Sequence, residues 1–305
     1  MASDDAEWPA LDYAAWHDSC ATLHLWTQIV GKIRMAHAPA ANHWWHVPLY
    51  LTSRGLTTSP MPYGGRSFQI DFDFIGHQLL IAASDGRGDC FALTPCSVAQ
   101  FYEELTGRLR ALDLATRIWT TPVEIADPIP FEQDHLHAAY EPDWVNRFWR
   151  VLSQVDQVLK AFRAGFLGKA SPVHFFWGSF DLAVTRFSGR PAPPPPKNPM
   201  IPDRVNREAY SHEVSSCGFW PGNGGFGEAA FYCYAYPQPA GFAEAASGPP
   251  GAFYAKDVGE FILPYSAVRG AAAPAELLLD FLQATYQAAA DLAGWDRAAL
   301  ERAAA

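Results

Sequence analysis

The residues best suited to chemistry gather in two predicted strands of the second half of the chain. The first, residues 173–187, carries His174 and Asp181 within an otherwise apolar stretch. An ionised carboxylate in apolar surroundings is costly unless it meets a cation, a hydrogen-bond donor or a proton. We therefore expect His174 and Asp181 to act as acid/base groups. The alternative is a structural ion pair between Asp181 and a nearby arginine such as Arg186 or Arg190.

The second strand, residues 210–219, is unusually polar at its start, where His212 and Glu213 stand next to each other. Successive side chains of a strand point to opposite faces, so both can serve one site only across a bulge or at a strand end. Each of the two is a catalytic candidate, and one alone is the simpler expectation. Cys217 lies in the same stretch. We expect it to be a free thiol, and a role as nucleophile is the weaker alternative.

Aromatic and basic residues nearby suit the binding of an organic molecule. In residues 230–236, Tyr232 and Tyr234 alternate with smaller side chains, so their hydroxyl groups share one face. An arginine near a strand end suits a carboxylate or phosphate group. The predicted ligand-binding residues are Trp45, Trp177, Arg186, Tyr232 and Tyr234.

A metal site is a further hypothesis. The predicted ligands are His46, His174 and His212, which with a carboxylate would suit Zn or Fe. His43 and His46 have His-x-x-His spacing, but on the strand predicted for residues 44–51 their side chains diverge. The alternative is packed histidines that hydrogen-bond to the backbone, and the sequence has no His-Glu-x-x-His signature.

The elements that must position these residues follow from the spacing of apolar side chains. In the first half, helical spacing predicts helices at 22–37 and 97–112, and period-two alternation predicts a strand at 67–74 that starts a β-meander. Another strand is predicted at 117–125. The second half repeats the order with a long helix at 143–166, strands at 173–187, 210–219, 230–236 and 258–263, and a closing helix at 274–292.

This order of elements predicts an α+β fold in which antiparallel meanders carry packed helices. We expect a single structural unit over residues 1–305, with two similar halves, 1–127 and 128–305, as a possible internal repeat. The proline-rich loop 191–199 could be a lid, a docking segment or a plain connector.

Composition and charge exclude several classes of protein. The formal net charge of −10 argues against binding to nucleic acid. No stretch of about 18 apolar residues occurs, so we expect no membrane span. The first ten residues lack the basic start and apolar run of a signal peptide, and the five cysteines form no Cys-x-x-Cys pair. A cytoplasmic location is therefore expected, and the oligomeric state stays open.

Several longer runs are distinctive as a set: residues 22–32, 42–50, 174–190 and 211–222, all of which contain Trp, His or both. Together they resemble an uncharacterised bacterial family, domain-of-unknown-function family 5996. The resemblance extends over nearly the whole chain and implies one unit and not a fusion of two. It implies no reaction, cofactor or catalytic residue.

Three functions follow as hypotheses. The first is an enzyme that acts on a small anionic or aromatic molecule in an aromatic-lined pocket, by His and carboxylate acid/base chemistry or with a divalent metal. The second is a module that binds such a ligand without transforming it, such as a sensor. The third is a structural or interaction protein that uses exposed aromatic residues and the proline-rich loop.

Overall fold

The structure is a computed structural model that describes residues 7–246 and 248–302. Residues 1–6, part of the segment searched for a signal peptide, lie outside this range. The chain forms two compact units. The amino-terminal unit contains Asp12–Trp149 and Phe175–Phe180, and the carboxyl-terminal unit contains Met1–Leu11, Arg150–His174 and Asp181–Ala305. The predictions of a single structural unit and of two similar halves stay predictions.

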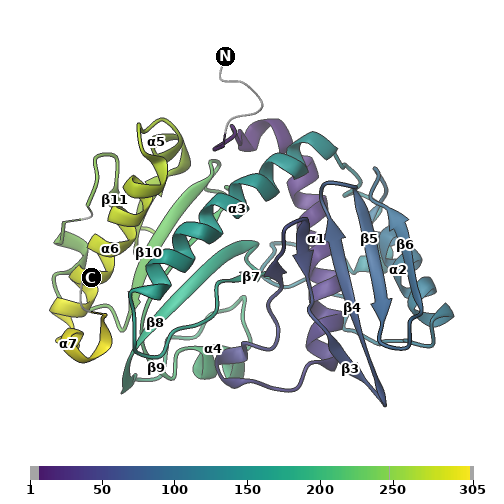
Figure 1. The fold of residues 1–305 in the computed structure, drawn as a ribbon, viewed down its shortest axis with the longest axis horizontal. Coiled ribbons are helices and arrows are strands. Elements are labelled where there is room, and N and C mark those ends of the chain that lie inside the picture. Colours follow the sequence, from purple (N-terminus) through teal and green to yellow (C-terminus); the bar gives the residue numbers. More distant parts are fainter. Residues whose placement is uncertain (1–6, 247, 303–305) are drawn as a thin grey trace. The chain divides into compact units, whose positions relative to one another are not determined.

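The amino-terminal unit contains an antiparallel sheet in the order β1-β2-β4-β5-β6, with β3 paired to β4. Figure 1 shows β4, β5 and β6 of this sheet side by side. In β4 the alternate residues Phe68, Ile70 and Phe72 are buried, as their period-two spacing predicts. The meander β4-β5-β6 is confirmed by its antiparallel pairing. The strands are β1 (Tyr50–Leu51), β2 (Gly55–Thr57), β3 (Met61–Tyr63), β4 (Arg66–Asp73), β5 (Gln78–Ala83) and β6 (Gly88–Ala92).

Two helices pack in this unit, α1 (Tyr13–His37) and α2 (Val98–Ala111). Ser97 begins α2 with a capping box, because its side chain accepts from the Gln100 N–H and the Gln100 side chain accepts from the Ser97 N–H. Trp26 of α1 stacks on Phe101 of α2 with ring centroids 4.6 Å apart. The helices predicted at 22–37 and 97–112 are therefore confirmed, and α1 begins nine residues earlier than predicted.

The strand predicted at residues 117–125 does not form. Instead, side chains of α1 bind the backbone of residues 119–123, within the segment 116–123 that we call the strap. Lys32 donates to the carbonyl groups of Trp119 (3.1 Å) and Thr121 (2.5 Å). Gln28 donates to the Val123 carbonyl (2.8 Å) and accepts from the Val123 N–H (2.9 Å). Three alternate carbonyl groups, those of Trp119, Thr121 and Val123, are thus bound by helix side chains, which provide the bonds that a neighbouring strand would otherwise supply.

The carboxyl-terminal unit holds a second antiparallel sheet, in the order β11-β12-β10-β9-β8-β7. Its central strands are largely apolar on one face and mixed on the other. The strands are β7 (His174–Phe176, of which His174 belongs to this unit), β8 (Asp181–Pro191), β9 (His212–Trp220), β10 (Ala230–Tyr236), β11 (Phe253–Ala255) and β12 (Glu260–Pro264).

Helices cover one face of this sheet. Figure 1 shows α6 (Pro274–Leu292, yellow) running alongside β10, and α3 (Pro142–Ala164) contributes Phe162 to the side of Arg186. The remaining helices are α4 (Asp203–Ala209), α5 (Tyr265–Arg269) and α7 (Arg297–Leu300), with short 3-10 turns η1 (Asn42–Trp44), η2 (Phe131–Gln133) and η3 (Phe242–Glu244). None of the helices in the described residues combines the length and apolar character needed to cross a membrane.

The predicted fold class is confirmed, since helices pack with two antiparallel sheets. One predicted strand is divided: residues 173–187 form β7 and β8 with a tight turn between them. Phe180 makes this turn possible by adopting a left-handed backbone conformation with φ of 63°. The strand predicted at 44–51 is likewise mostly a turn, because His43 and Trp44 also have positive φ.

Candidate functional site: the polar-aromatic face of the carboxyl-terminal sheet

One face of the carboxyl-terminal sheet gathers carboxyl groups, hydroxyl groups and aromatic rings. The register places Tyr232 of β10 beside Gly218 of β9 and Ile262 of β12, and Gly218 beside Ala183 of β8. Residues two apart on a strand share a face. We therefore define the polar-aromatic face by its polar and aromatic members and the glycine among them: Asp181, Thr185, Phe187, His212, Ser216, Gly218, Trp220, Tyr232, Tyr234, Tyr236 and Glu260.

The centre of this face is a hydrogen bond that crosses an intervening strand. Tyr232 of β10 donates its hydroxyl proton to Asp181 of β8, and β9 lies between these strands. The ring passes over Gly218, where a Cβ atom would lie 2.5 Å from the Tyr232 hydroxyl oxygen. The close approach therefore requires glycine at this position. Burial and the charge of Asp181 raise the pKa of Tyr232 well above its usual value, so the hydroxyl keeps its proton at neutral pH.

A second carboxyl group, Glu260, lies on the same face. It begins β12 two residues before Ile262, and continuing the β10-β12 register brings it level with Tyr234. Burial, and then the charge of Asp181, raise the pKa of Glu260 to about 7. No hydrogen bond or ion pair of its carboxyl group occurs among the described residues. The sequence prediction missed Glu260, although an acidic residue that begins the apolar run Phe261–Leu263 was a usable signal.

Hydroxyl groups and rings surround these two carboxyl groups. The Tyr234 and Tyr210 hydroxyl oxygens are 2.8 Å apart, and Tyr210 follows α4. The Ser216 and Thr185 hydroxyl oxygens are also 2.8 Å apart. Trp220 packs against Tyr232 with ring centroids separated by 5.3 Å. The centre of the face is buried, at Asp181, Tyr232 and Ser216. Its margin is half-buried and therefore partly exposed, at Tyr234, Glu260 and Trp220.

Arg186, predicted to bind a ligand or to pair with Asp181, points to the opposite face. Its guanidinium carbon lies 3.4 Å from the ring centroid of Phe162 and 4.3 Å from that of Tyr286, and it donates to the Phe162 carbonyl. Burial lowers the pKa of Arg186 to about 10. Arg186 therefore joins β8 to α3 and α6, and the other arginine considered for Asp181, Arg190, pairs with Glu213.

The thiol of Cys217 also faces the helices. It lies directly across from Cys233, whose pKa is raised well above its usual value by burial. Cys217 itself is buried, with its Sγ atom 3.7 Å from the Val184 carbonyl oxygen. Neither thiol belongs to the polar-aromatic face.

The adjacent candidates His212 and Glu213 separate, as the strand period predicts. The Glu213 carboxylate accepts hydrogen bonds from Ser188 (2.8 Å) and Arg190 (2.6 Å), which gives it a structural role. His212 begins β9 on the side of Ser216 and Gly218, and its Nδ1 atom lies 3.1 Å from the Ser211 hydroxyl. Of the pair, only His212 shares the polar-aromatic face.

Four predicted site residues lie outside β8, β9 and β10: His174, Trp45, His46 and Trp177. His174 is buried at the start of β7 in the carboxyl-terminal unit. Trp45, His46 and Trp177 belong to the amino-terminal unit. There Trp177 donates to the Val47 carbonyl (2.8 Å) and packs on Gly31, while His46 Nδ1 accepts from the Ala41 N–H (3.2 Å).

The predicted metal ligands are divided between the two units, because His46 lies in one and His174 and His212 lie in the other. Among the described residues, no group of three His, Cys, Asp or Glu side chains is arranged to hold a metal ion.

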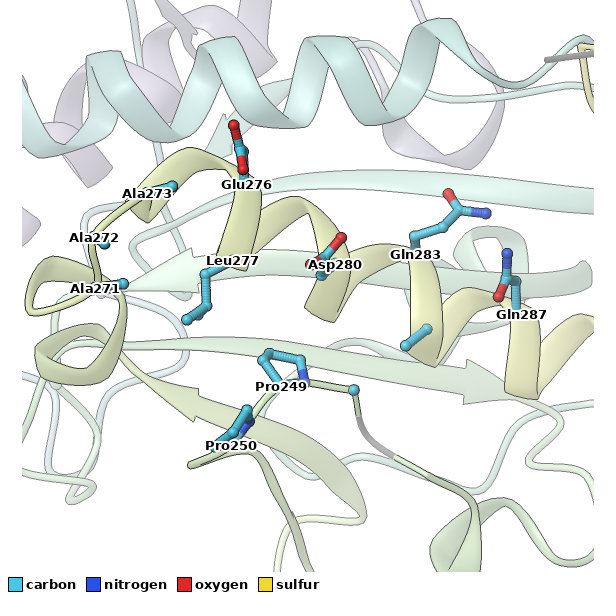
Figure 2. Close-up of a pocket in the computed structure, with 12 residues that line it drawn as sticks. Pro249, Pro250, Ala271, Ala272, Ala273, Glu276, Leu277, Asp280, Gln283 and Gln287 are labelled. Carbon is cyan, nitrogen blue, oxygen red and sulfur yellow. The ribbon is translucent and has the colours of Figure 1, made fainter.

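The surface also has two hollows in the carboxyl-terminal unit. The larger, with a volume of about 730 Å³, is an open groove beside α6. Figure 2 shows Leu277 of α6 extending toward Pro249 and Pro250, with Glu276 and Asp280 on the same helix. The smaller, about 190 Å³, is lined by Glu213, Tyr236 and Trp295 among others. Apart from Glu213, neither hollow includes a predicted site residue.

A comparison with protein families gives a match over nearly the whole chain. The sequence model of a family described as "Family of unknown function (DUF5996)" matches residues 8–302, which include both units. No curated protein and no solved structure matches the chain.

Proposed function

Since the chain belongs to the DUF5996 family, whose function is unknown, its activity has to be argued from its residues, and we propose that it is an enzyme that acts on a small organic molecule at the polar-aromatic face. The observation that carries this proposal is the Tyr232-Asp181 hydrogen bond over Gly218, with a second carboxyl group, Glu260, on the same face. Groups of this kind with shifted pKa values concentrate at catalytic sites.

Each group has a distinct role in the proposal. Glu260 transfers the proton, because a carboxyl group with a pKa of about 7 can both release and accept a proton at neutral pH. Asp181 holds the Tyr232 hydroxyl in one orientation, and the tyrosine oxygen in turn accepts a hydrogen bond from the substrate. His174 and His212 stay candidates for a second acid/base group.

The experiment is an activity search that leaves the identity of the substrate open. The full chain is incubated with a mixture of small metabolites, and consumption is followed by mass spectrometry. We expect a compound to be consumed by the wild type, with loss of about 10²- to 10⁴-fold in rate for Glu260→Gln. Asp181→Asn tests the hydrogen bond that orients the Tyr232 hydroxyl. Glu276→Gln, which removes an exposed carboxylate on α6, is the matched control and should retain full activity.

The same experiment separates the alternatives. A compound that binds and protects the protein but is never consumed would favour a non-catalytic ligand-binding or sensor module. If no compound binds or reacts, a structural or interaction protein becomes the better proposal. Loss of activity in Glu276→Gln equal to that in Glu260→Gln would argue against the polar-aromatic face.

A further inference from the structure

The polar-aromatic face offers more hydrogen-bond acceptors than donors to a ligand. Asp181 and Glu260 both supply carboxyl oxygens. Tyr232 has already donated its only hydroxyl proton to Asp181, so its oxygen is left with lone pairs that can accept. A ligand that matches these groups must itself be rich in donors or carry positive charge.

The described strand positions of this face, in β8, β9, β10 and β12, carry acidic side chains and no lysine or arginine. Arg186 is on the helix-covered face and Arg190 is paired with Glu213. The arginines from which an anionic substrate was predicted therefore do not lie on this face. A lysine from the segment beside β8, Lys169, has its Nζ atom 5.2 Å from the ring centroid of Phe187.

Aromatic rings complete the match to a cation. Tyr232 and Tyr234 are stacked with centroids 6.2 Å apart, and Trp220 lies against Tyr232. Continuing the β10-β12 register brings Glu260 level with Tyr234, so its carboxyl group and the tyrosine rings lie on neighbouring strands of one face. Ring faces attract ammonium groups, and the attraction grows when water is excluded.

We propose that the polar-aromatic face binds an organic cation, an amine or quaternary ammonium compound, with Glu260 as its counter-ion and the rings of Tyr232, Tyr234 and Trp220 as its walls. This inference rests on the proposed function and adds the chemical class of the substrate. The Glu260 carboxylate would pair with the positive charge of the ligand. The aromatic rings would contact its apolar groups.

The test compares probes of equal shape and different charge on the full chain. Choline is paired with its neutral isostere 3,3-dimethylbutan-1-ol, and 2-phenylethylamine with 2-phenylethanol and phenylacetate. Titration calorimetry at low salt should show binding of at least one cation, at least tenfold tighter than its neutral partner. Glu260→Gln should weaken that binding at least tenfold, whereas the control Glu276→Gln should leave it unchanged.

The pH dependence supplies a second readout, because the charge of choline does not change with pH. Glu260 ionises near pH 7, so the affinity for choline, if choline binds, should rise about tenfold between about pH 6 and about pH 8. The other titratable groups of this face and of the segments packed on it are Asp181, His212, Tyr232, Tyr234 and Tyr236 on the strands, Tyr210 after α4, and Lys169 beside β8. In Glu260→Gln the rise should disappear.

The outcomes distinguish this inference from the proposed function. If phenylacetate or a neutral probe binds as tightly as the cation and depends on Glu260, the site stands and the cationic class is wrong. If neither cation binds, or if binding does not change in Glu260→Gln, the inference is overturned, whereas the proposed function is decided separately by the consumption of metabolites.

Discussion

At the scale of single residues, Gly218 decides whether the site exists. Alanine at this position would bring its Cβ within 2.5 Å of both the Tyr232 hydroxyl oxygen and the Leu182 carbonyl oxygen. We expect Gly218→Ala to break the Tyr232-Asp181 hydrogen bond and to lower the free energy of unfolding by about 1–3 kcal/mol. Chemical denaturation measures the loss. The control is Gly107→Ala in α2, where the added Cβ would meet no atom within 4 Å apart from the neighbouring backbone of its own helix, and alanine should stabilise the helix.

Glu260 makes a prediction about pH. Its folded-state pKa of about 7 lies above the usual 4.5, so the folded protein holds a proton that the unfolded chain has released. The stability of the wild type therefore falls as the pH rises through this interval. In Glu260→Gln this fall is removed. The free energy of unfolding of the variant minus that of the wild type should therefore rise by on the order of 2 kcal/mol from about pH 5 to about pH 8. Urea unfolding of both proteins at both pH values measures this difference. If the difference between variant and wild type is the same at the two pH values, the pKa of Glu260 is not raised.

At the scale of elements, the sequence predicts what local spacing controls. The alternation of Phe68, Ile70 and Phe72 identifies β4, and the Ser97-Gln100 capping box places the start of α2. The bounds of α6 also follow from helical spacing. These elements bury one stripe or face of their own side chains, so the pattern and the structure have the same cause.

Elements that depend on distant partners could not be predicted in this way. The sequence of the strap predicts a strand. Three of its carbonyl groups are instead bound by Gln28 and Lys32, some 90 residues earlier in the chain. In the site, Asp181 and Tyr232 were both predicted, yet their contact depends on the register that places Gly218 between them. Arg186 was assigned to the site although it is five residues from Asp181, a spacing that places the two on opposite faces of a strand.

The strap therefore makes a prediction about local stability. Gln28→Ala removes both partners of the Val123 backbone, and burying unpaired backbone groups costs about 1–3 kcal/mol. We expect hydrogen exchange of the Val123 amide to accelerate at least tenfold, with little change in β4 and β5. The control is Gln157→Ala, which removes an exposed glutamine of α3. Equal exchange at Val123 in the wild type and Gln28→Ala would contradict the role of Gln28.

At the scale of the whole molecule, the two units are interleaved along the chain. Each is built from segments that are distant in sequence, because the chain leaves each unit and later returns to it. Trp8, near the start of the chain, packs against Tyr265 of α5, and the Tyr265 hydroxyl donates to the Pro9 carbonyl at 2.7 Å. The amino-terminal residues thus stabilise a unit whose sheet begins more than 160 residues later.

This interleaving can be tested with two tryptophans. Trp8 is 6% exposed and Trp119 is 65% exposed, so the same truncation should have unequal costs. We expect Trp8→Ala to lose about 3–5 kcal/mol by leaving a cavity beside Tyr265. Trp119→Ala should stay within about 1 kcal/mol. Hydrogen exchange followed by mass spectrometry should then accelerate in β12 and α5 of the Trp8 variant more than in β4 and β5. Equal acceleration in both sheets would mean that the two units unfold together, and faster exchange confined to β4 and β5 would contradict the placement of Trp8 in the carboxyl-terminal unit.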